Sequence, residues 1–293
     1  MRTKAMFTPR VRTLGASLRE VRLGAHFGVR ELARRIGVNP SLVAHWEFGS
    51  RVPTPEDVSA VLGALGVVGD EKMRILNLAR GSAEEGWIAY GRPGTPNQLT
   101  CLVACEHAAK AMAEWSPLGI PGLLQTADYA RALLESTGLA AAEVERRIAV
   151  RMERRNLILG SDPLPFEALI GEAALRDTLG TPATMAGQLR ALASLSERPT
   201  ITVRVVPSGI GWHPGLAGRF ILYTIRDSRP VVYFEHLSSG AFVADDYDVR
   251  QYRAAIEGIR KVALSAADST ALATRLAEEI EERAGDRSGV AQE

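Results

Sequence analysis

The sequence predicts an all-α N-terminal domain followed by a larger α+β domain. Apolar residues recur at helical spacing through most of residues 12–79, which is typical of amphipathic helices. Glycine and proline then interrupt every periodic pattern between residues 81 and 98. Apolar or alternating runs typical of strands occur only after this stretch. At 293 residues, the chain is long enough for two domains that each bury a core.

The N-terminal domain is expected to hold five helices within residues 1–80. The first covers residues 12–25, where Leu14, Leu18 and Val21 lie at helical spacing. Two short helices follow within residues 29–53. A fourth helix is predicted over residues 55–65, and a fifth is capped by Asp70 and ends near Ala79.

Residues 29–53 predict two short helices joined by a tight turn. The first helix has its apolar positions at helical spacing, namely Leu32, Ala33 and Ile36. Gly37 follows where a helix C-terminus favours positive φ, and Val38 can fill the space between the helices. Asn39 is expected to cap the second helix, with Pro40 in its first turn. This arrangement is a helix-turn-helix, which fits the DNA major groove.

The second of these helices has an apolar face and a polar face. Its inward stripe consists of Leu42, Val43 and Trp46. The outward positions are Ser41, Ala44 and His45. When such a unit docks on DNA, the N-terminal half of this helix faces base edges. We therefore interpret Asn39, Pro40, Ser41, Ala44 and His45 as base-contacting residues, with Pro40 able to touch a thymine methyl group.

Phosphate contacts are predicted on both sides of this helix. Arg51 follows it and carries the bidentate fork that suits phosphate oxygens, and Arg30 lies in the first turn of the preceding helix. Glu47 is expected to orient a neighbouring arginine, because phosphate would repel it. Arg34 and Arg35 are interpreted as the solvated face of their helix.

The charge distribution also indicates that the DNA-binding part lies in residues 1–80. Residues 1–80 contain 13 Lys and Arg against 7 Asp and Glu, a net charge of +6. Residues 81–293 contain 22 against 27, a net charge of −5. A positive face on the first domain would attract the phosphate backbone.

The 29–53 string resembles the helix-turn-helix of the XRE regulators, which share the lambda-repressor-like fold. The resemblance rests on Glu31-Leu-Ala, Gly37-Val, Trp46-Glu and Gly49-x-Arg-x-Pro53, which recur in that order. It implies a regulator that binds double-stranded DNA as a homodimer. The chain departs from the family at Gly28 and Val29, where relatives have a polar cap and a glutamine. Either the N–H groups at the helix start near Gly28 or the Arg30 side chain is the expected substitute for that phosphate contact.

The second domain is expected at residues 99–284, after a linker at 81–98 and before a flexible tail at 285–293. Helices are predicted at residues 99–115, 126–135, 142–159, 172–179, 185–195, 247–264 and 269–283. Strands are predicted at residues 164–171, 200–206, 219–225 and 231–236. Helices that outnumber a sheet of about four or five strands indicate an α+β domain.

The second domain resembles that of actinobacterial XRE regulators of the WhiJ type. The most specific string is Ile120-Pro-Gly-Leu-Leu-Gln-Thr-x-x-Tyr-Ala-Arg131. Further strings are Glu106 to Ala111 with Trp115, Arg147 with Arg151-x-x-Arg154-Arg155, Gly171–Arg176, Gln188-Leu, Ile201–Pro207 and Val232–Glu235. The resemblance implies that this domain receives a signal or a small BldB-like protein encoded nearby, in an antitoxin-like pair.

Other candidate sites are less distinctive. Cys101 and Cys105 lie one helical turn apart with His107 close behind, but such cysteines are more often core packing, so no metal or cofactor is expected. The arginines at 147, 151, 154 and 155 are expected to form ion pairs with Glu143, Glu145 and Glu153 rather than to bind an anion. A ligand or partner surface is assigned to Trp212, His213, Tyr223, Tyr233 and Glu235, although alternation within a half-buried sheet explains them equally well.

No hydrolase elbow, zinc-protease or phosphate-cradling motif occurs, which favours a regulator over an enzyme. Two cysteines, no apolar run of about 18 residues and no signal peptide predict a cytoplasmic protein without a membrane segment. The sequence leaves three alternatives open for the second domain: a protein-interaction module, a small-molecule-gated switch, and an enzyme with an appended DNA-binding domain.

Overall fold

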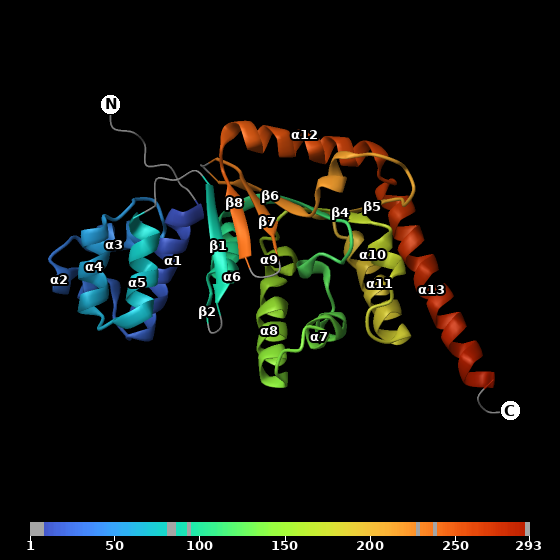
Figure 1. The fold of residues 1–293 in the computed structure, drawn as a ribbon, viewed down its shortest axis with the longest axis horizontal. Helices are drawn as coiled ribbons and strands as arrows, with labels where there is room; N and C mark the ends of the chain where they lie inside the picture. The colour runs from blue at the N-terminus through green and yellow to red at the C-terminus, as the bar shows by residue number, and fades with distance from the viewer. Residues whose placement is uncertain (1–8, 81–85, 93–94, 227–228, 237–238, 291–293) are drawn as a thin grey trace. The chain divides into compact units, whose positions relative to one another are not determined.

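In the computed structural model, the chain divides into two compact units. The first comprises Met1–Ala109 with Tyr223–Arg250, and the second comprises Lys110–Leu222 with Gln251–Glu293. The structure describes residues 9–80, 86–92, 95–226, 229–236 and 239–290 (Figure 1). Within these residues, no helix is both long enough and apolar enough to span a membrane.

The first unit begins with a bundle of five helices, drawn in blue to cyan in Figure 1. These are α1 (Pro9–Gly24), α2 (Val29–Ile36), α3 (Pro40–Glu47), α4 (Pro55–Ala64) and α5 (Gly69–Arg80). Their apolar faces meet in one core that includes Leu14, Leu32, Val43, Trp46 and Leu62. Removing these faces from water is the main force that holds helices this short together.

Local signals set several helix boundaries, and those at Gly37 and Asn39 agree with the sequence prediction. The expected cap of the fifth helix, Asp70, instead lies inside α5, which begins at Gly69. Gly37 ends α2 in the left-handed conformation with φ 74°, which a side chain would disfavour. Asn39 caps α3, because its side chain accepts a hydrogen bond from the Ser41 N–H at 2.9 Å. Thr54 and Asp57 form a reciprocal capping box at the start of α4.

The rest of the first unit combines helix α6 with an antiparallel sheet. Strand β1 (Gly86–Arg92) pairs with β2 (Thr95–Pro96) and with β8 (Ser239–Val243), which pairs with β7 (Val231–Glu235). Helix α6 (Asn97–Ala108) packs against α1 and β1. The helix bundle therefore packs, through α1, against a helix from outside residues 1–80.

The second unit is built on three parallel strands. Their order is β3 (Ala109–Ser116), β4 (Phe166–Gly171) and β5 (Ile201–Val206), with Met112 opposite Phe166 and Phe166 opposite Ile201. Long α13 (Ala266–Val290) packs beside α11 (Pro182–Ser196) and against β5 (Figure 1). The Ser269 hydroxyl accepts from the Val205 N–H at 2.9 Å, so the start of α13 protects the edge of β5.

Shorter elements complete this unit. They are the 3-10 turns η1 (Gly122–Leu124) and η2 (Pro214–Ala217) and helices α7 (Ala127–Glu135), α8 (Ala141–Arg154), α9 (Asn156–Leu159) and α10 (Ala173–Arg176). Strand β6 (Phe220–Ile225) and helix α12 (Asp246–Val262) each contain a boundary between the two units, after Leu222 and after Arg250.

Two buried amide side chains organise the connection between β3 and α7. Gln125 donates to the Ile120 carbonyl at 2.8 Å and accepts from the Arg151 guanidinium at 2.7 Å. Gln188, on α11, accepts from the Thr126 N–H at 2.7 Å and donates to the Leu124 carbonyl at 3.0 Å. These amides satisfy backbone groups that the irregular turn leaves without helix or sheet partners.

The fold class is confirmed, since a helical N-terminal region is followed by an α+β part. Three element predictions were wrong. The helix expected over residues 99–115 ends at Ala108, and the next eight residues form β3. Residues 81–98, expected to be a linker, contain β1 and β2, while 81–85 and 93–94 lie outside the described residues. The tail expected at 285–293 continues as helix to Val290.

The reason for the errors at residues 109–116 and in the expected linker is strand pairing between distant segments. Ala, Lys, Met and Glu in residues 109–116 favour helix locally, but parallel pairing with β4 places Met112 and Trp115 in the core. Strand β8 was not predicted because Ser239 and Gly240 are poor strand formers, and it exists through pairing with β1 and β7.

We expect Gly15→Ala to lower the melting temperature measured by circular dichroism. A Cβ atom at Gly15 on α1 would lie 2.5 Å from the Trp46 carbonyl oxygen, and the overlap should cost about 1–3 kcal/mol. Gly63→Ala on α4 is the matched control, because its Cβ meets nothing within 4 Å. That change should stabilise by about 0.5–1 kcal/mol. Equal effects of the two substitutions would contradict the close approach of α1 to α3.

We expect Gln188→Leu to lower the free energy of unfolding of the second unit by about 2–4 kcal/mol, because two buried backbone groups lose their partners. Hydrogen exchange of the amides in η1 and α7 measures this loss. Gln251→Leu, at an exposed position on α12, is the control and should change little. An unchanged exchange rate at Thr126 in Gln188→Leu would refute the role of this amide.

Candidate nucleic-acid interface

The helix-turn-helix consists of α2, the turn at Gly37 and Val38, and α3. The Val38 N–H donates to the Ala33 carbonyl at 2.9 Å, which closes the end of α2. The Val38 side chain is half-buried against the core of the bundle, as the sequence predicted. Trp46 and Val43 on α3 are buried in the same core, so the orientation of α3 about its own axis is fixed.

A buried ion pair ties α3 to α1. The Arg22 guanidinium binds both carboxylate oxygens of Glu47, with Nε–Oε1 2.6 Å and Nη2–Oε2 2.7 Å. Its third nitrogen donates to the Phe27 carbonyl in the α1–α2 turn at 2.8 Å. The side chains of Arg22 and Glu47 are 7% and 5% exposed. The hydrogen bonds to Glu47 raise the pKa of Arg22. The pairing also neutralises Glu47, the single acidic residue of α3.

The outward face of α3 carries the residues that the sequence assigned to base contacts. Asn39, Pro40, Ser41 and His45 are exposed, and Ala44 is half-buried between them. The Ser41 hydroxyl donates to Asn39 Oδ1 at 2.8 Å, and His45 Nδ1 lies 2.7 Å from the Ser50 hydroxyl. The structure therefore brings these five residues together on one face of one short helix.

The two arginines assigned to phosphate contacts are also exposed. Arg30 lies in the first turn of α2, and Arg51 follows α3. Gly28 forms the N-cap of α2 without a side-chain hydrogen bond, so the first N–H groups of α2 have no cap from that residue. Such a helix start favours an anion. Arg34 and Arg35 are exposed as expected, and the Arg35 guanidinium lies 5.3 Å from the Phe27 ring centroid.

The sequence favoured core packing for Cys101 and Cys105, and both are buried. Cys101 and Cys105 are buried free thiols on α6, which packs against α1, and His107 is exposed. Burial raises the pKa of Cys105 to about 12 and raises that of Cys101 further, which keeps both as thiols. Among the described residues, no group of three or more His, Cys, Asp or Glu side chains could hold a metal ion.

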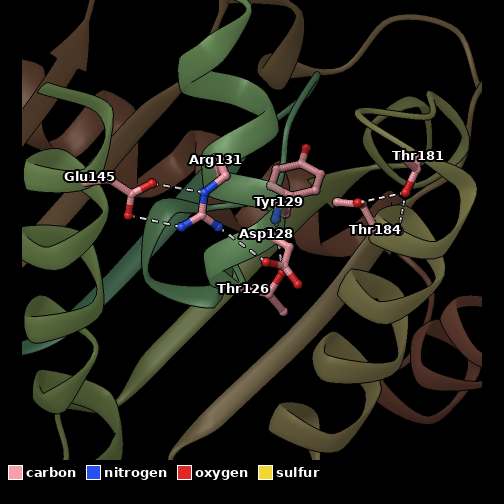
Figure 2. A network of polar contacts seen from close by, with 7 residues as sticks. All are labelled: Thr126, Asp128, Tyr129, Arg131, Glu145, Thr181 and Thr184. Carbon is pink, nitrogen blue, oxygen red and sulfur yellow. Dashed lines mark hydrogen bonds and ion pairs between the residues drawn. The ribbon is translucent and has the colours of Figure 1, made fainter. Parts of the chain in front are cut away.

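The arginines of α8 pair with other side chains of the second unit. Arg147 pairs with Glu143 at 2.6 Å, in agreement with the ion-pair interpretation, whereas Arg151 binds the Gln125 amide. Glu145 binds Arg131 of α7 through two contacts of 3.1 Å (Figure 2). This exposed network joins α7 to α8 and contributes little to stability in water.

The residues assigned to a ligand or partner surface lie in different environments. Tyr223 and Tyr233 are buried at 0% and 1% exposure, and Tyr233 packs on Phe242 with ring centroids 4.7 Å apart. His213 is buried and meets Trp115 edge to face. Trp212 is 82% exposed, and Glu235 is also exposed. Only these two offer a side chain at the surface, and their role stays a prediction.

Sequence reasoning missed two residues that shape the α3 face. Arg22 lies 25 residues before its partner Glu47, so no local pattern links them. Ser50 stands five residues after His45 in a loop whose path only the folded chain reveals. The sequence did predict that Glu47 orients an arginine, and this is confirmed.

The fold and this exposed face define a helix-turn-helix protein with an α+β second part, and comparison with protein families agrees. Residues 13–74 match the model of a helix-turn-helix domain. Residues 99–275, more than half of the chain, match a domain of unknown function (DUF5753). The chain therefore belongs to the DUF5753 family. No curated protein matches it.

We expect Glu47→Ala to lower the opening free energy of α3, measured by amide hydrogen exchange, by about 3–5 kcal/mol, because it leaves Arg22 buried without its carboxylate. The control is Glu31→Ala on the exposed face of α2, which should change it by less than about 0.5 kcal/mol. The double variant Arg22→Ala with Glu47→Ala should lose less than the two single losses added together. Additive losses would show that the pair is not coupled.

Proposed function

We propose that this chain is a sequence-specific transcription regulator that places α3 in the major groove of double-stranded DNA. The observation that carries the proposal is the outward face of α3. It presents Ser41 and His45 beside the cap residue Asn39, while the acidic group of α3 is turned inward and neutralised by Arg22. Polar, uncharged side chains on a helix in the groove suit direct reading of base edges.

Contacts on this surface fall into two classes. Asn39, Pro40, Ser41, Ala44 and His45 form the base-reading class, because they lie on the exposed N-terminal half of α3 and its cap. Arg30 and Arg51 form the phosphate class, because they are exposed at the start of α2 and after the end of α3. Phosphate contacts set position and general affinity, and base contacts set sequence preference.

In this proposal the chain works as a homodimer on two half-sites about one turn of DNA apart, in the bacterial cytoplasm, and as a regulator rather than an enzyme. The region that matches DUF5753, residues 99–275, would supply the dimer contact or bind a small protein of the BldB type, as the resemblance to WhiJ-type, antitoxin-like regulators implies. The exposed Trp212 supports a protein contact. A pocket for a small-molecule effector is less favoured, because Tyr223 and Tyr233 have no exposed side chain to offer.

The proposal is tested by selecting DNA duplexes from a random pool with the full-length protein and then measuring the affinity of variants for an enriched duplex. We expect Arg51→Ala to weaken binding to the enriched duplex and to a scrambled one by similar factors, and to reduce the salt dependence by about one phosphate contact. Ser41→Ala should weaken only the enriched duplex, by about threefold to tenfold. Fluorescence anisotropy at several salt concentrations measures both effects.

Arg80→Ala, at the last residue of α5, is the control for loss of one exposed arginine and should leave both affinities nearly unchanged. Equal loss on both duplexes for Arg51→Ala and Ser41→Ala would remove the distinction between phosphate and base contacts. Failure of the full-length protein to enrich any sequence would overturn the proposed function itself.

A further inference from the structure

We propose that Arg19 on α1 is a further phosphate-binding residue of the DNA interface, and that the Phe48 ring positions its guanidinium. The inference rests on the proposed function, since it adds a contact to the phosphate class formed by Arg30 and Arg51. Three observations carry it: the contact of Arg19 with Phe48, the exposure of both side chains, and the close packing of α1 on the end of α3.

The Arg19 guanidinium lies over the Phe48 ring, with Cζ 6.0 Å from the ring centroid. This distance is at the outer limit of the range over which the face of an aromatic ring attracts a cation. Arg19 is exposed, and among the described residues no acidic side chain forms an ion pair with it. Its N–H groups are therefore available to an acceptor from outside the chain.

Phe48 is an exposed aromatic residue at the end of α3. It forms the C-cap of the helix, and its N–H donates to the Ala44 carbonyl at 2.9 Å. Its side chain is 68% exposed, so most of the ring lies outside the core of the helix bundle. A planar guanidinium stacks on such a ring and keeps its outer N–H groups directed into solvent. The ring therefore offers a rigid support for Arg19.

The packing of α1 on α3 places Arg19 at this end of α3. Gly15, Arg19 and Arg22 are separated by four and three residues, so they lie on one face of α1. A Cβ atom at Gly15 would lie 2.5 Å from the Trp46 carbonyl oxygen, and Arg22 binds Glu47. Arg19 stands between these two contacts along α1, so its backbone is held beside the last turn of α3.

Arg51 lies at the same end of α3, because its N–H donates to the His45 carbonyl at 3.2 Å. A helix in the major groove has a phosphate strand along each wall, and the planar fork of an arginine matches two phosphate oxygens. In this inference, Arg30 holds the DNA backbone at the start of α2, and Arg19 and Arg51 hold it at the end of α3.

The test measures the affinity of full-length variants for an enriched and a scrambled duplex, by fluorescence anisotropy at several salt concentrations. Arg19→Ala should weaken binding to both duplexes about twofold to fivefold, and should reduce the slope of log affinity against log salt by about 0.9. Arg35→Ala is the matched control, because the Arg35 guanidinium also lies over a ring, that of Phe27, in the last turn of α2. It should leave both affinities and the slope nearly unchanged. Equal effects of the two substitutions would reduce the role of Arg19 to general positive charge and overturn the inference.

Variants of Phe48 test its positioning role. Phe48→Leu keeps an apolar side chain but removes the ring, so it should weaken binding to both duplexes, whereas Phe48→Tyr keeps the ring and should bind like the wild type. In the Arg19→Ala background, Phe48→Leu should cause no further loss, because both changes remove the same contact. Additive losses would mean that the ring acts without Arg19, which contradicts the positioning role. Melting temperatures should match that of the wild type, since both side chains are exposed.

The salt dependence separates failure of this inference from failure of the proposed function. An unchanged slope for Arg19→Ala on an enriched duplex would refute the phosphate contact and leave the proposed function standing. Failure of the wild type to enrich any duplex would overturn the proposed function, and the slope on the scrambled duplex would still test the contact, because phosphate binding does not depend on base sequence.

Discussion

The buried pair of Arg22 and Glu47 is the interaction on which the geometry of the helix-turn-helix depends. The pair joins α1 to the last residue of α3, and the third nitrogen of the guanidinium holds the turn that leads into α2. Burying the two charges costs desolvation free energy. The bidentate ion pair and the additional hydrogen bond to the Phe27 carbonyl offset this cost. Because apolar packing alone permits sliding, these directional bonds fix the helices relative to one another. The close approach of α1 to α3 at Gly15 has the same effect.

The electrostatic consequence is as important as the geometric one. Glu47 would repel phosphate if it pointed outward, but its carboxylate is engaged by Arg22 and is 5% exposed. The outward face of α3 is then left without a carboxylate and carries the polar side chains of Ser41 and His45 beside Asn39. Exposed arginines lie before and after it. The proposed function needs such a separation of the α3 face from the arginines beside it, because base contacts set sequence preference and phosphate contacts set general affinity.

In the second unit, residues 120–131, the most specific string of the family resemblance, have a structural role. Leu123 and Leu124 are buried, Gln125 and Gln188 satisfy the turn after β3, and Thr126 caps α7. These residues therefore help to hold the fold of the region that matches DUF5753. Surface residues outside the string, such as Trp212, are better candidates for contacts with a partner.

The sequence predicted the features that are encoded locally. Gly37, Asn39 and Pro40 carry their own turn and capping signals, so the helix-turn-helix and the outward face of α3 could be derived before the structure was known. Strand β3 could not, because its residues favour helix and become a strand only by pairing with β4, about 50 residues away. The partners Arg22 and Ser50 were inaccessible for a related reason: each acts through a contact that the folded backbone creates.

The measurement that tests the central claim most directly is sequencing of genomic fragments bound by the full-length protein, using DNA from the organism that encodes it. The account predicts enrichment of a small set of fragments that share one motif with two-fold symmetry, retained at a salt concentration that releases other DNA. Binding spread evenly over the genome, and lost uniformly as salt rises, would contradict the claim that α3 reads sequence.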